Sequence, residues 1–182
     1  MRYQLIETFT GPFAVIEDDG GALQTTWLTA EQRRRLRGLK PDRTLQPELV
    51  EQLQQYFAGE TVNFSNAPLP EASAFTRSCW KICRRIPRGQ TISFGELAKR
   101  AGSPGAARAA GQAMRNNPMP IITPCHRVVG SSGKLHGFGG SCDVEGKQLD
   151  IKAKLLAMES APASRTAARK VRASRPRQLA FA

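Results

Sequence analysis

Three consecutive residues, Cys125, His126 and Arg127, are the ones in this chain whose side chains could do covalent chemistry together. They follow a β-branched apolar run, residues 121–123, that stops at Pro124, and a pair of valines comes after them. The thiolate is the reactive form of cysteine, and neighbouring positive charge lowers the pKa of a thiol. The pattern predicts a strand that presents a nucleophilic thiol beside an imidazole and a guanidinium. A buried structural cysteine is the alternative for the Cys-His pair taken alone, since most free cysteines are packing residues.

The four cysteines, at positions 79, 83, 125 and 142, are unevenly spaced. In a chain without an export signal this spacing favours free thiols over a disulfide framework. Cys79 and Cys83 are four residues apart, and no second ligand pair follows at a suitable distance, so the sequence predicts no metal site. Both cysteines fall on the apolar face of an expected helix and are interpreted as core residues.

The net charge of +12 is concentrated toward the C-terminal end of the chain. Residues 1–70 carry 7 basic and 9 acidic side chains, residues 71–160 carry 14 and 6, and residues 161–182 carry 6 and none. A basic segment around the Cys-His pair suggests a polyanionic partner, and nucleic acid is the one we expect. A merely soluble basic surface is the alternative. The run from Arg33 to Arg35 is interpreted as a solvated helix face.

The hydrophobic pattern argues against a membrane protein. No apolar run approaches the roughly 20 residues that a bilayer span requires. The first nine residues lack the basic-then-apolar pattern of a signal peptide. We therefore expect a soluble, intracellular protein, cytoplasmic and associated with the nucleoid (nuclear if eukaryotic), with no membrane partner.

The N-terminal segment predicts a small antiparallel sheet with helices, and nothing in it looks catalytic. Residues 3–9, 13–17 and 22–28 alternate as strands, and Asp18-Asp19-Gly20-Gly21 is a strong turn signal between the last two. Thr29 and Gln32 form a capping-box pattern for a helix to about residue 37. Pro47 begins a second helix, and the polar stretch 60–71 is interpreted as a linker.

The C-terminal segment predicts a helix over residues 73–86 and then two short helices. Ser93 and Glu96 form a capping box for a helix over 94–101, and Ser103 is expected to cap a helix that starts at Pro104 and runs to about 115. Two helices joined by a Gly-Ser turn in a basic segment predict a helix-turn-helix. The second is rich in Ala and Gly, so it could lie close to another helix or in a DNA groove, with Arg108 as the long side chain near its start.

The remaining segments complete the predicted α+β architecture. Residues 130–133 read as a hairpin-like turn, and the loop to residue 140 could form the wing of a winged helix. A last helix is expected over residues 149–159. Residues 161–182 are rich in Ala, Ser, Arg and Pro without apolar periodicity, which predicts a disordered basic tail.

Several of these motifs together resemble one family, the O6-alkylguanine-DNA alkyltransferases, also called methylated-DNA–protein-cysteine methyltransferases. The resemblance is carried by Asn117-Pro118, by Pro124-Cys125-His126-Arg127-Val128, by the Ala-Ala-Arg helix and by the terminal Leu-Leu-x-x-Glu, and it is dense from about Phe75 to Glu159. It implies an RNase H-like N-terminal domain over residues 1–70, a winged-helix DNA-binding and alkyl-acceptor domain over 71–160, and the tail from 161.

The resemblance also implies a role for individual residues. Cys125 would attack the alkyl carbon and keep the group, and His126 would take the thiol proton through a bound water. Glu159 would orient and charge that histidine, and Asn117 would hold the turn around the site. Residues implied at the DNA interface are Arg108, which would enter the base stack, with Phe94, Gly95, Ser103 and Ser131; those implied in the base pocket are Val128, Phe138 and Gly139.

The implied activity is single-turnover repair of O6-alkylguanine, and of O4-alkylthymine, by irreversible stoichiometric transfer to Cys125 after base flipping. The implied partner is double-stranded DNA containing O6-alkylguanine, bound by a monomer that needs no cofactor and no metal. The reacting carbon lies inside a duplex, so the base must be extruded at a cost of a few kcal/mol. A groove-fitting helix with one intruding arginine could offset that cost.

Three positions depart from the family's pattern in a way that bears on the chemistry. The family usually has Tyr where this chain has Phe94 and Phe138, and Ser is common at Gly139; a Phe ring keeps the stacking surface but not the donor. We therefore predict slower transfer than in a Tyr-bearing relative.

Residues 141–148 look like an insertion relative to the family. The alternative function is a damaged-base sensor with weak or no transferase activity, and a cysteine hydrolase fits poorly because hydrolases bring their histidine from elsewhere.

Overall fold

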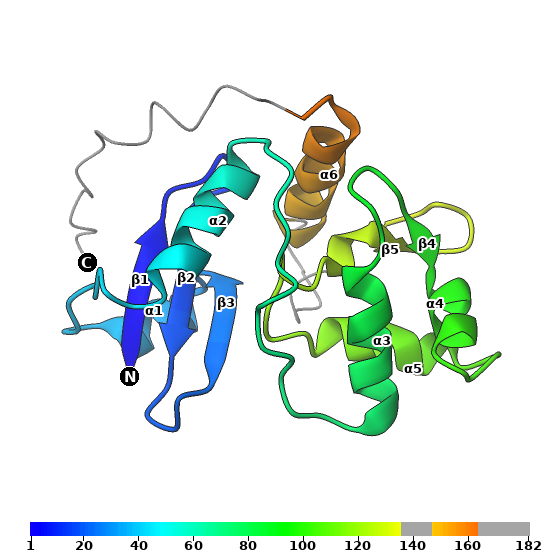
Figure 1. Cartoon of the computed structure of the whole chain (residues 1–182), viewed down its shortest axis with the longest axis horizontal. Coiled ribbons are helices and arrows are strands. Elements are labelled where there is room, and N and C mark those ends of the chain that lie inside the picture. The colour runs from blue at the N-terminus through cyan, green and yellow to red at the C-terminus, as the bar shows by residue number, and fades with distance from the viewer. Residues whose placement is uncertain (136–146, 164–182) are drawn as a thin grey trace. The chain divides into compact units, whose positions relative to one another are not determined.

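The computed structural model describes residues 1–135 and 147–163, with the side chain of residue 147 excepted (Figure 1). The chain divides into two compact units, unit 1 from Met1 to Asn63 and unit 2 from Phe64 to Pro162. Within the described ranges, no helix is both long enough and apolar enough to cross a membrane.

Unit 1 is built on a three-stranded antiparallel sheet in the order β1-β2-β3. Strands β1 (Arg2–Ile6), β2 (Phe13–Glu17) and β3 (Leu23–Trp27) follow one another along the chain. The β2–β3 turn is held by the Asp18 carboxylate, which accepts from the backbone N–H groups of Gly20 (2.9 Å) and Ala22 (2.8 Å). Helices α1 (Ala30–Leu36) and α2 (Pro47–Phe57) follow, so the predicted α+β class with an N-terminal antiparallel sheet is confirmed.

The core of unit 1 follows the period of two along β2. Ala14 and Ile16 pack in one cluster with Tyr3 and with Leu36 of α1. Successive strand side chains point to opposite faces. Phe13 therefore faces the other way, and its ring meets Phe57 of α2 edge-on at 5.1 Å. All four of the first β2 residues are buried because each face of the strand is covered.

Unit 2 is mostly helical. Helices α3 (Ala74–Arg84), α4 (Phe94–Arg100) and α5 (Ala107–Arg115) pack together, and the indole N–H of Trp80 donates to the carbonyl of Ala113 at 2.9 Å in the core. Two short strands, β4 (Ile92–Ser93) and β5 (Val128–Val129), pair in parallel. The 3₁₀ helix η1 (Cys125–Arg127) precedes β5, and α6 (Lys147–Ser160) lies against η1 (Figure 1).

The predicted start of α5 is wrong. The helix begins at Ala107, and its N-cap residue, Ala106, makes no side-chain capping bond. Ser103 instead accepts the Ala106 N–H on its backbone carbonyl at 3.1 Å, closing a turn, and Gly105 has a φ of +87° that ends any helical path from Pro104. At α4, Ser93 accepts from Glu96 N–H as predicted, but the Glu96 side chain pairs with Arg100 at 2.7 Å, so half of the expected capping box forms.

The predicted strand through the Cys-His pair is also wrong, because the chain coils there. Ile121 has a φ of +74°, which a β-branched residue adopts only under strain. Thr123 N–H then donates back to the Met119 carbonyl at 2.8 Å, and Cys125 to Arg127 form the single 3₁₀ turn η1. The strand is limited to Val128 and Val129.

Some sequence expectations lie partly or wholly outside the described residues. The turn after β5 is present, since Gly130 N–H donates to the Lys134 carbonyl at 2.9 Å. The rest of the expected wing, from residue 136 onward, lies outside the described residues. So do most of the expected insertion over 141–148 and residues 164–182 of the expected tail.

Candidate active site

The sulfur of Cys125 lies in an almost closed environment. The residue is 5% exposed, and its Sγ accepts a hydrogen bond from the side-chain amide of Asn117 at 3.3 Å. The same amide nitrogen donates to the Thr123 carbonyl at 2.8 Å, and the Asn117 Oδ1 accepts from Met119 N–H at 3.0 Å. Asn117 therefore ties both ends of the segment that leads into η1 and aims an N–H group at the thiol.

His126 is completely buried and faces a carboxylate. Its Nε2 lies 3.0 Å from Glu159 Oε1, and Glu159 is 3% exposed near the end of α6. The guanidinium of Arg127 donates to both oxygens of the same carboxylate, with Nε 2.8 Å from Oε2 and Nη2 2.7 Å from Oε1. Arg127 also donates to the Ile86 carbonyl at 2.6 Å. The sequence placed this guanidinium beside the thiol, whereas the structure places it on Glu159.

The electrostatics of this network fix the protonation states. Burial opposes ionisation of Glu159, but hydrogen bonds from His126 and Arg127 outweigh it and hold the pKa of the carboxyl well below its usual range. Burial lowers the pKa of His126, and the Glu159 hydrogen bond opposes that shift only in part. A neutral imidazole beside a carboxylate carries its hydrogen on the nitrogen that faces the acceptor. The His126 Nδ1 is then the basic nitrogen.

Burial raises the pKa of Cys125, so the resting group is a thiol rather than a thiolate. The hydrogen bond from Asn117 and the charge of Lys152 act in the opposite direction. The site therefore holds a protonated sulfur, a buried neutral base and two groups that favour the anion once it forms. Such an arrangement suits a nucleophile that loses its proton when a substrate is bound.

Lys152 is a member of the site that the sequence reasoning missed. It is 1% exposed, its ammonium donates to the Val128 carbonyl at 2.7 Å, and it lies 5.8 Å from the centre of the Phe94 ring. Burial lowers its pKa, and the nearby Cys125 opposes that shift. One signal was present in the sequence: Lys152 shares the stripe of α6 that also carries Leu155 and Glu159, at spacings of three and seven residues.

A tight turn holds the C-terminal end of α6, and with it Glu159. Gly89 has a φ of +75°, and a Cβ added there would meet the Glu159 carbonyl oxygen at 3.0 Å. Arg88 donates from Nη2 to the Met158 carbonyl at 2.9 Å. The turn between α3 and β4 thus fixes the position of a carboxylate 70 residues away along the chain.

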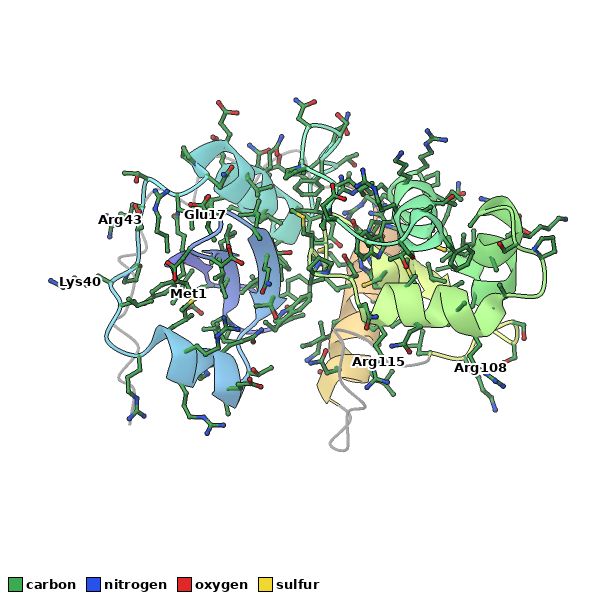
Figure 2. The ribbon with its side chains drawn as sticks, turned by 90° about the horizontal axis from the view of Figure 1, so that it is seen from below. Met1, Glu17, Lys40, Arg43, Arg108 and Arg115 are labelled. Carbon is green, nitrogen blue, oxygen red and sulfur yellow. The ribbon has the colours of Figure 1, made fainter. Side chains whose placement is uncertain are left out.

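Four of the predicted DNA-contact residues lie on α4 and α5 or in the turn between them, and the fifth, Ser131, lies in the turn after β5. Arg108 is exposed, and in Figure 2 it extends from α5 away from unit 2; Arg115, at the other end of the helix, is exposed as well. The opposite face of α5 buries Ala110 and Ala113 against the neighbouring helices. The small residues therefore serve helix packing on one face, while the other face of the helix is exposed. Gly95 and Ser131 are exposed and Ser103 is half-buried.

The predicted base pocket is described only in part. Val128 is fully buried and its strand pairs with β4, which brings it beside the start of α4. The half-buried Phe94 ring lies beside Gly111 of α5, at 3.8 Å from where a Cβ on that glycine would be, which is an ordinary van der Waals distance. Phe138 and Gly139 lie outside the described residues. Across the part of the chain that the structure describes, no group of three or more His, Cys, Asp or Glu side chains could hold a metal ion.

Two family models match the chain. The model described as the ribonuclease-like domain of 6-O-methylguanine DNA methyltransferase matches residues 1–70, and the one described as the DNA-binding domain of that protein matches residues 74–161.

Individual relatives match over most of their length. A methylated-DNA–protein-cysteine methyltransferase of Methanosarcina acetivorans is 36% identical over 164 residues, covering 87% of this chain and 98% of that protein. One from Mycolicibacterium paratuberculosis is 49% identical over 119 residues, covering 64% and 68%. Among solved structures, Mycobacterium tuberculosis OGT in complex with DNA superposes with a TM-score of 0.71 at 38% identity, covering 88% of this chain and 93% of that one.

Proposed function

Since this chain belongs to the methylated-DNA–protein-cysteine methyltransferase family, we propose that Cys125 is its alkyl acceptor and that O6-alkylguanine in duplex DNA is its substrate. The chain is a DNA-repair methyltransferase that moves an alkyl group from DNA to a protein cysteine. The observation that carries the choice of cysteine is the Asn117 N–H group aimed at Cys125 Sγ, one residue from the buried His126–Glu159 pair.

The reaction is a displacement at the alkyl carbon. The Cys125 thiol gives its proton to His126 Nδ1, directly or through a water, and the sulfur electron pair forms the new S–C bond. The C–O6 bond breaks and its electron pair stays on the guanine, and the proton that His126 took from the thiol finally neutralises the purine anion, so that the alkyl group and the proton exchange places. Glu159 and Arg127 keep the imidazole in the tautomer that can accept the proton. The thioether does not revert, so each chain acts once.

The DNA contacts follow from the open face of α5. Arg108, near the start of that helix, is exposed and long enough to fill the gap left by a base that has swung out. Phe94, Gly95, Ser103 and Ser131 are assigned to the DNA interface around it. The flipped base would enter beside Val128, with Phe138 and Gly139 completing the pocket.

The same proposal extends to the wider organisation of the molecule. O4-alkylthymine presents a similar alkyl–oxygen bond and is assigned as a second substrate. Residues 71–160 are proposed to act as a winged-helix DNA-binding domain after an N-terminal domain over 1–70, in a cytoplasmic monomer that needs neither cofactor nor metal.

Intact-mass spectrometry with an O6-methylguanine oligonucleotide tests the assignment. We expect a gain of one methyl group per chain, complete at one equivalent of DNA and unchanged after the DNA is removed. Peptide mapping should place the methyl on Cys125. A damage sensor would bind the oligonucleotide with no change in mass.

Matched variants make the test specific. Cys125→Ser should take up no methyl group, while Cys83→Ser, which removes another buried thiol of the same unit, should still be methylated. A methyl group found on Cys79 or Cys83 in the unmodified chain would overturn the choice of acceptor.

A further inference from the structure

The positive charge of unit 1 is gathered into one short stretch. Residues 1–70 contain 7 basic side chains, and 6 of them fall between positions 33 and 43. The 9 acidic side chains of the same segment are spread from position 7 to position 60. We call this group the cationic strip; its members are Arg33, Arg34, Arg35, Arg37, Lys40 and Arg43.

The first half of the strip is held by α1. The reciprocal capping box of Thr29 and Gln32 fixes the start of the helix, with Gln32 N–H donating to Thr29 Oγ1 at 3.2 Å and Thr29 N–H to Gln32 Oε1 at 2.8 Å. Leu36 is 1% exposed and anchors its end in the core. With these two points fixed, Arg34 and Arg35 are exposed on the outer side of the helix.

The second half is held by a loop tied to β1. Asp42 N–H donates to the Tyr3 carbonyl at 2.8 Å, and the Tyr3 hydroxyl donates to the Leu39 carbonyl at 3.2 Å. The loop therefore has a fixed path, and Lys40 and Arg43 extend from it into solvent (Figure 2).

The one acidic residue inside the strip is already engaged. The Asp42 carboxylate accepts from Arg2 Nε at 2.7 Å and from the Thr44 hydroxyl at 2.7 Å. Hydrogen bonds from Thr44 and Arg2 lower the pKa of Asp42 to about 2, so it stays ionised and bound to these partners. Within residues 1–135 and 147–163, no ion pair involves Arg34, Arg35, Lys40 or Arg43.

Exposed cations held on a fixed backbone, as Arg34, Arg35, Lys40 and Arg43 are, suit the repeating phosphates of a nucleic-acid backbone. Arg and Lys on one face are the footprint of nucleic-acid binding, and each phosphate contact gains free energy from counterion release. Between positions 33 and 43, Leu39 at 38% is the one exposed large apolar side chain, so this surface lacks the apolar area that membrane insertion requires. A protein that acts on DNA meets this polyanion at each encounter.

We propose that the cationic strip of unit 1 is a second DNA-binding surface, which contacts the phosphate backbone of a duplex without reading sequence or damage. The proposal rests on the chain acting on DNA and adds to the contacts assigned to α5. The backbone it contacts belongs either to the duplex that carries the lesion or to a neighbouring duplex, and the experiment separates these sources.

The test is the salt dependence of binding to an undamaged duplex of about three helical turns, with the full chain. Each phosphate contact contributes about 0.9 to the slope of log K against log salt concentration. Replacing Arg34, Arg35 and Lys40 by Gln should lower the slope by up to about 2.7. A fourfold rise in salt would then weaken binding roughly 40-fold less than in the unmodified chain.

Two matched triple variants control for net charge and for folding. Arg34→Lys, Arg35→Lys and Lys40→Arg together keep the charge and should keep the slope. Lys81→Gln, Arg85→Gln and Lys99→Gln together remove the same charge from exposed positions of unit 2. This second variant should change the slope by less than the strip variant does.

Duplex length and stoichiometry show which DNA the cationic strip contacts, and the salt slope shows whether it contacts DNA at all. On a duplex of about one turn, roughly 10 base pairs, loss of the strip's effect supports contact with flanking DNA, while a persistent effect with two duplexes bound per chain supports a neighbouring duplex. An unchanged slope for the strip variant on every duplex overturns the proposal. Methylation of Cys125 is read separately by mass, so a failure of the repair assignment would leave this result standing.

Discussion

Replacing Lys152 by Met removes a buried cation near Cys125 while keeping an unbranched apolar stem of similar length. Lys152 is 1% exposed, and its ammonium donates to the Val128 carbonyl at 2.7 Å and lowers the pKa of Cys125 against the effect of burial. Without it, the pKa of the Cys125 thiol should rise further, because only the Asn117 hydrogen bond and backbone hydrogen bonds then oppose the effect of burial.

The size of the effect follows from two opposing terms. An opposite charge at close range shifts a pKa by about 1–3 units, so the thiolate fraction at neutral pH should fall roughly 10- to 1000-fold. A thiolate of higher pKa is a better nucleophile, with a Brønsted coefficient of about 0.4–0.5 that recovers nearly half of this loss on a logarithmic scale. The net result is a transfer rate about 3- to 60-fold lower at pH 7.

Unlike the transfer rate, the stability of the folded chain should not fall when Lys152 is replaced by Met. Burial lowers the pKa of Lys152, so the charged form is disfavoured in the folded state and weakens folding at pH values below the folded pKa. Removing a buried charge in favour of an apolar group is often neutral or stabilising. Loss of the hydrogen bond to the Val128 carbonyl destabilises the folded state by about 1 kcal/mol, which offsets part of that stabilisation. Lys152→Met should therefore melt at the same temperature as the unmodified chain or higher.

Single-turnover methyl transfer from an oligonucleotide, measured from pH 6 to pH 10, checks the prediction. The midpoint of the variant's profile should move to higher pH, and its rate at high pH should reach or exceed that of the unmodified chain. Lys154→Met is the control, because Lys154 is an exposed residue of the same helix paired with Asp150. A rate that falls equally at every pH together with a lower Tm would refute the reasoning and indicate a structural role.

Two further predictions concern the leaving group and the buried carboxylate. Phe94→Tyr restores a donor beside the half-buried ring position, and single-turnover transfer should speed up by at most about 100-fold, the lower end of what one oxyanion donor contributes; an unchanged or slower rate contradicts this. Glu159→Gln leaves Arg127 without its charge partner, and urea denaturation at pH 7 should show a loss of about 3–5 kcal/mol. Because the folded-state pKa of Glu159 is lowered, its stabilisation is complete above the unfolded value of about 4.3 and declines as pH falls. The difference between the variant and the unmodified chain should therefore be smaller at pH 3 than at pH 7, and a constant difference would contradict the assignment.

The features that the sequence determined by itself are those whose partners are neighbours along the chain. The Thr29–Gln32 capping box, the Asp18 turn and the Pro47 helix start each join residues within a few positions, and all formed as predicted. The Pro-Cys-His-Arg motif likewise pointed to the family from the sequence alone, because its residues are consecutive. Local geometry and side-chain type are sufficient for predictions of this kind.

Tertiary structure decided the features whose partners are distant. The coiling that made η1 instead of a strand depends on Asn117 reaching Thr123 and Cys125. The guanidinium of Arg127, which was expected beside the thiol, binds Glu159 instead, because folding brings this carboxylate, 32 residues away along the chain, to within 2.7 Å. Lys152 looked like any lysine of an amphipathic helix, and only the packing of α6 against η1 buried its charge beside the sulfur. Burial and the charges that oppose it are properties of the folded surroundings, which no local pattern of residues contains.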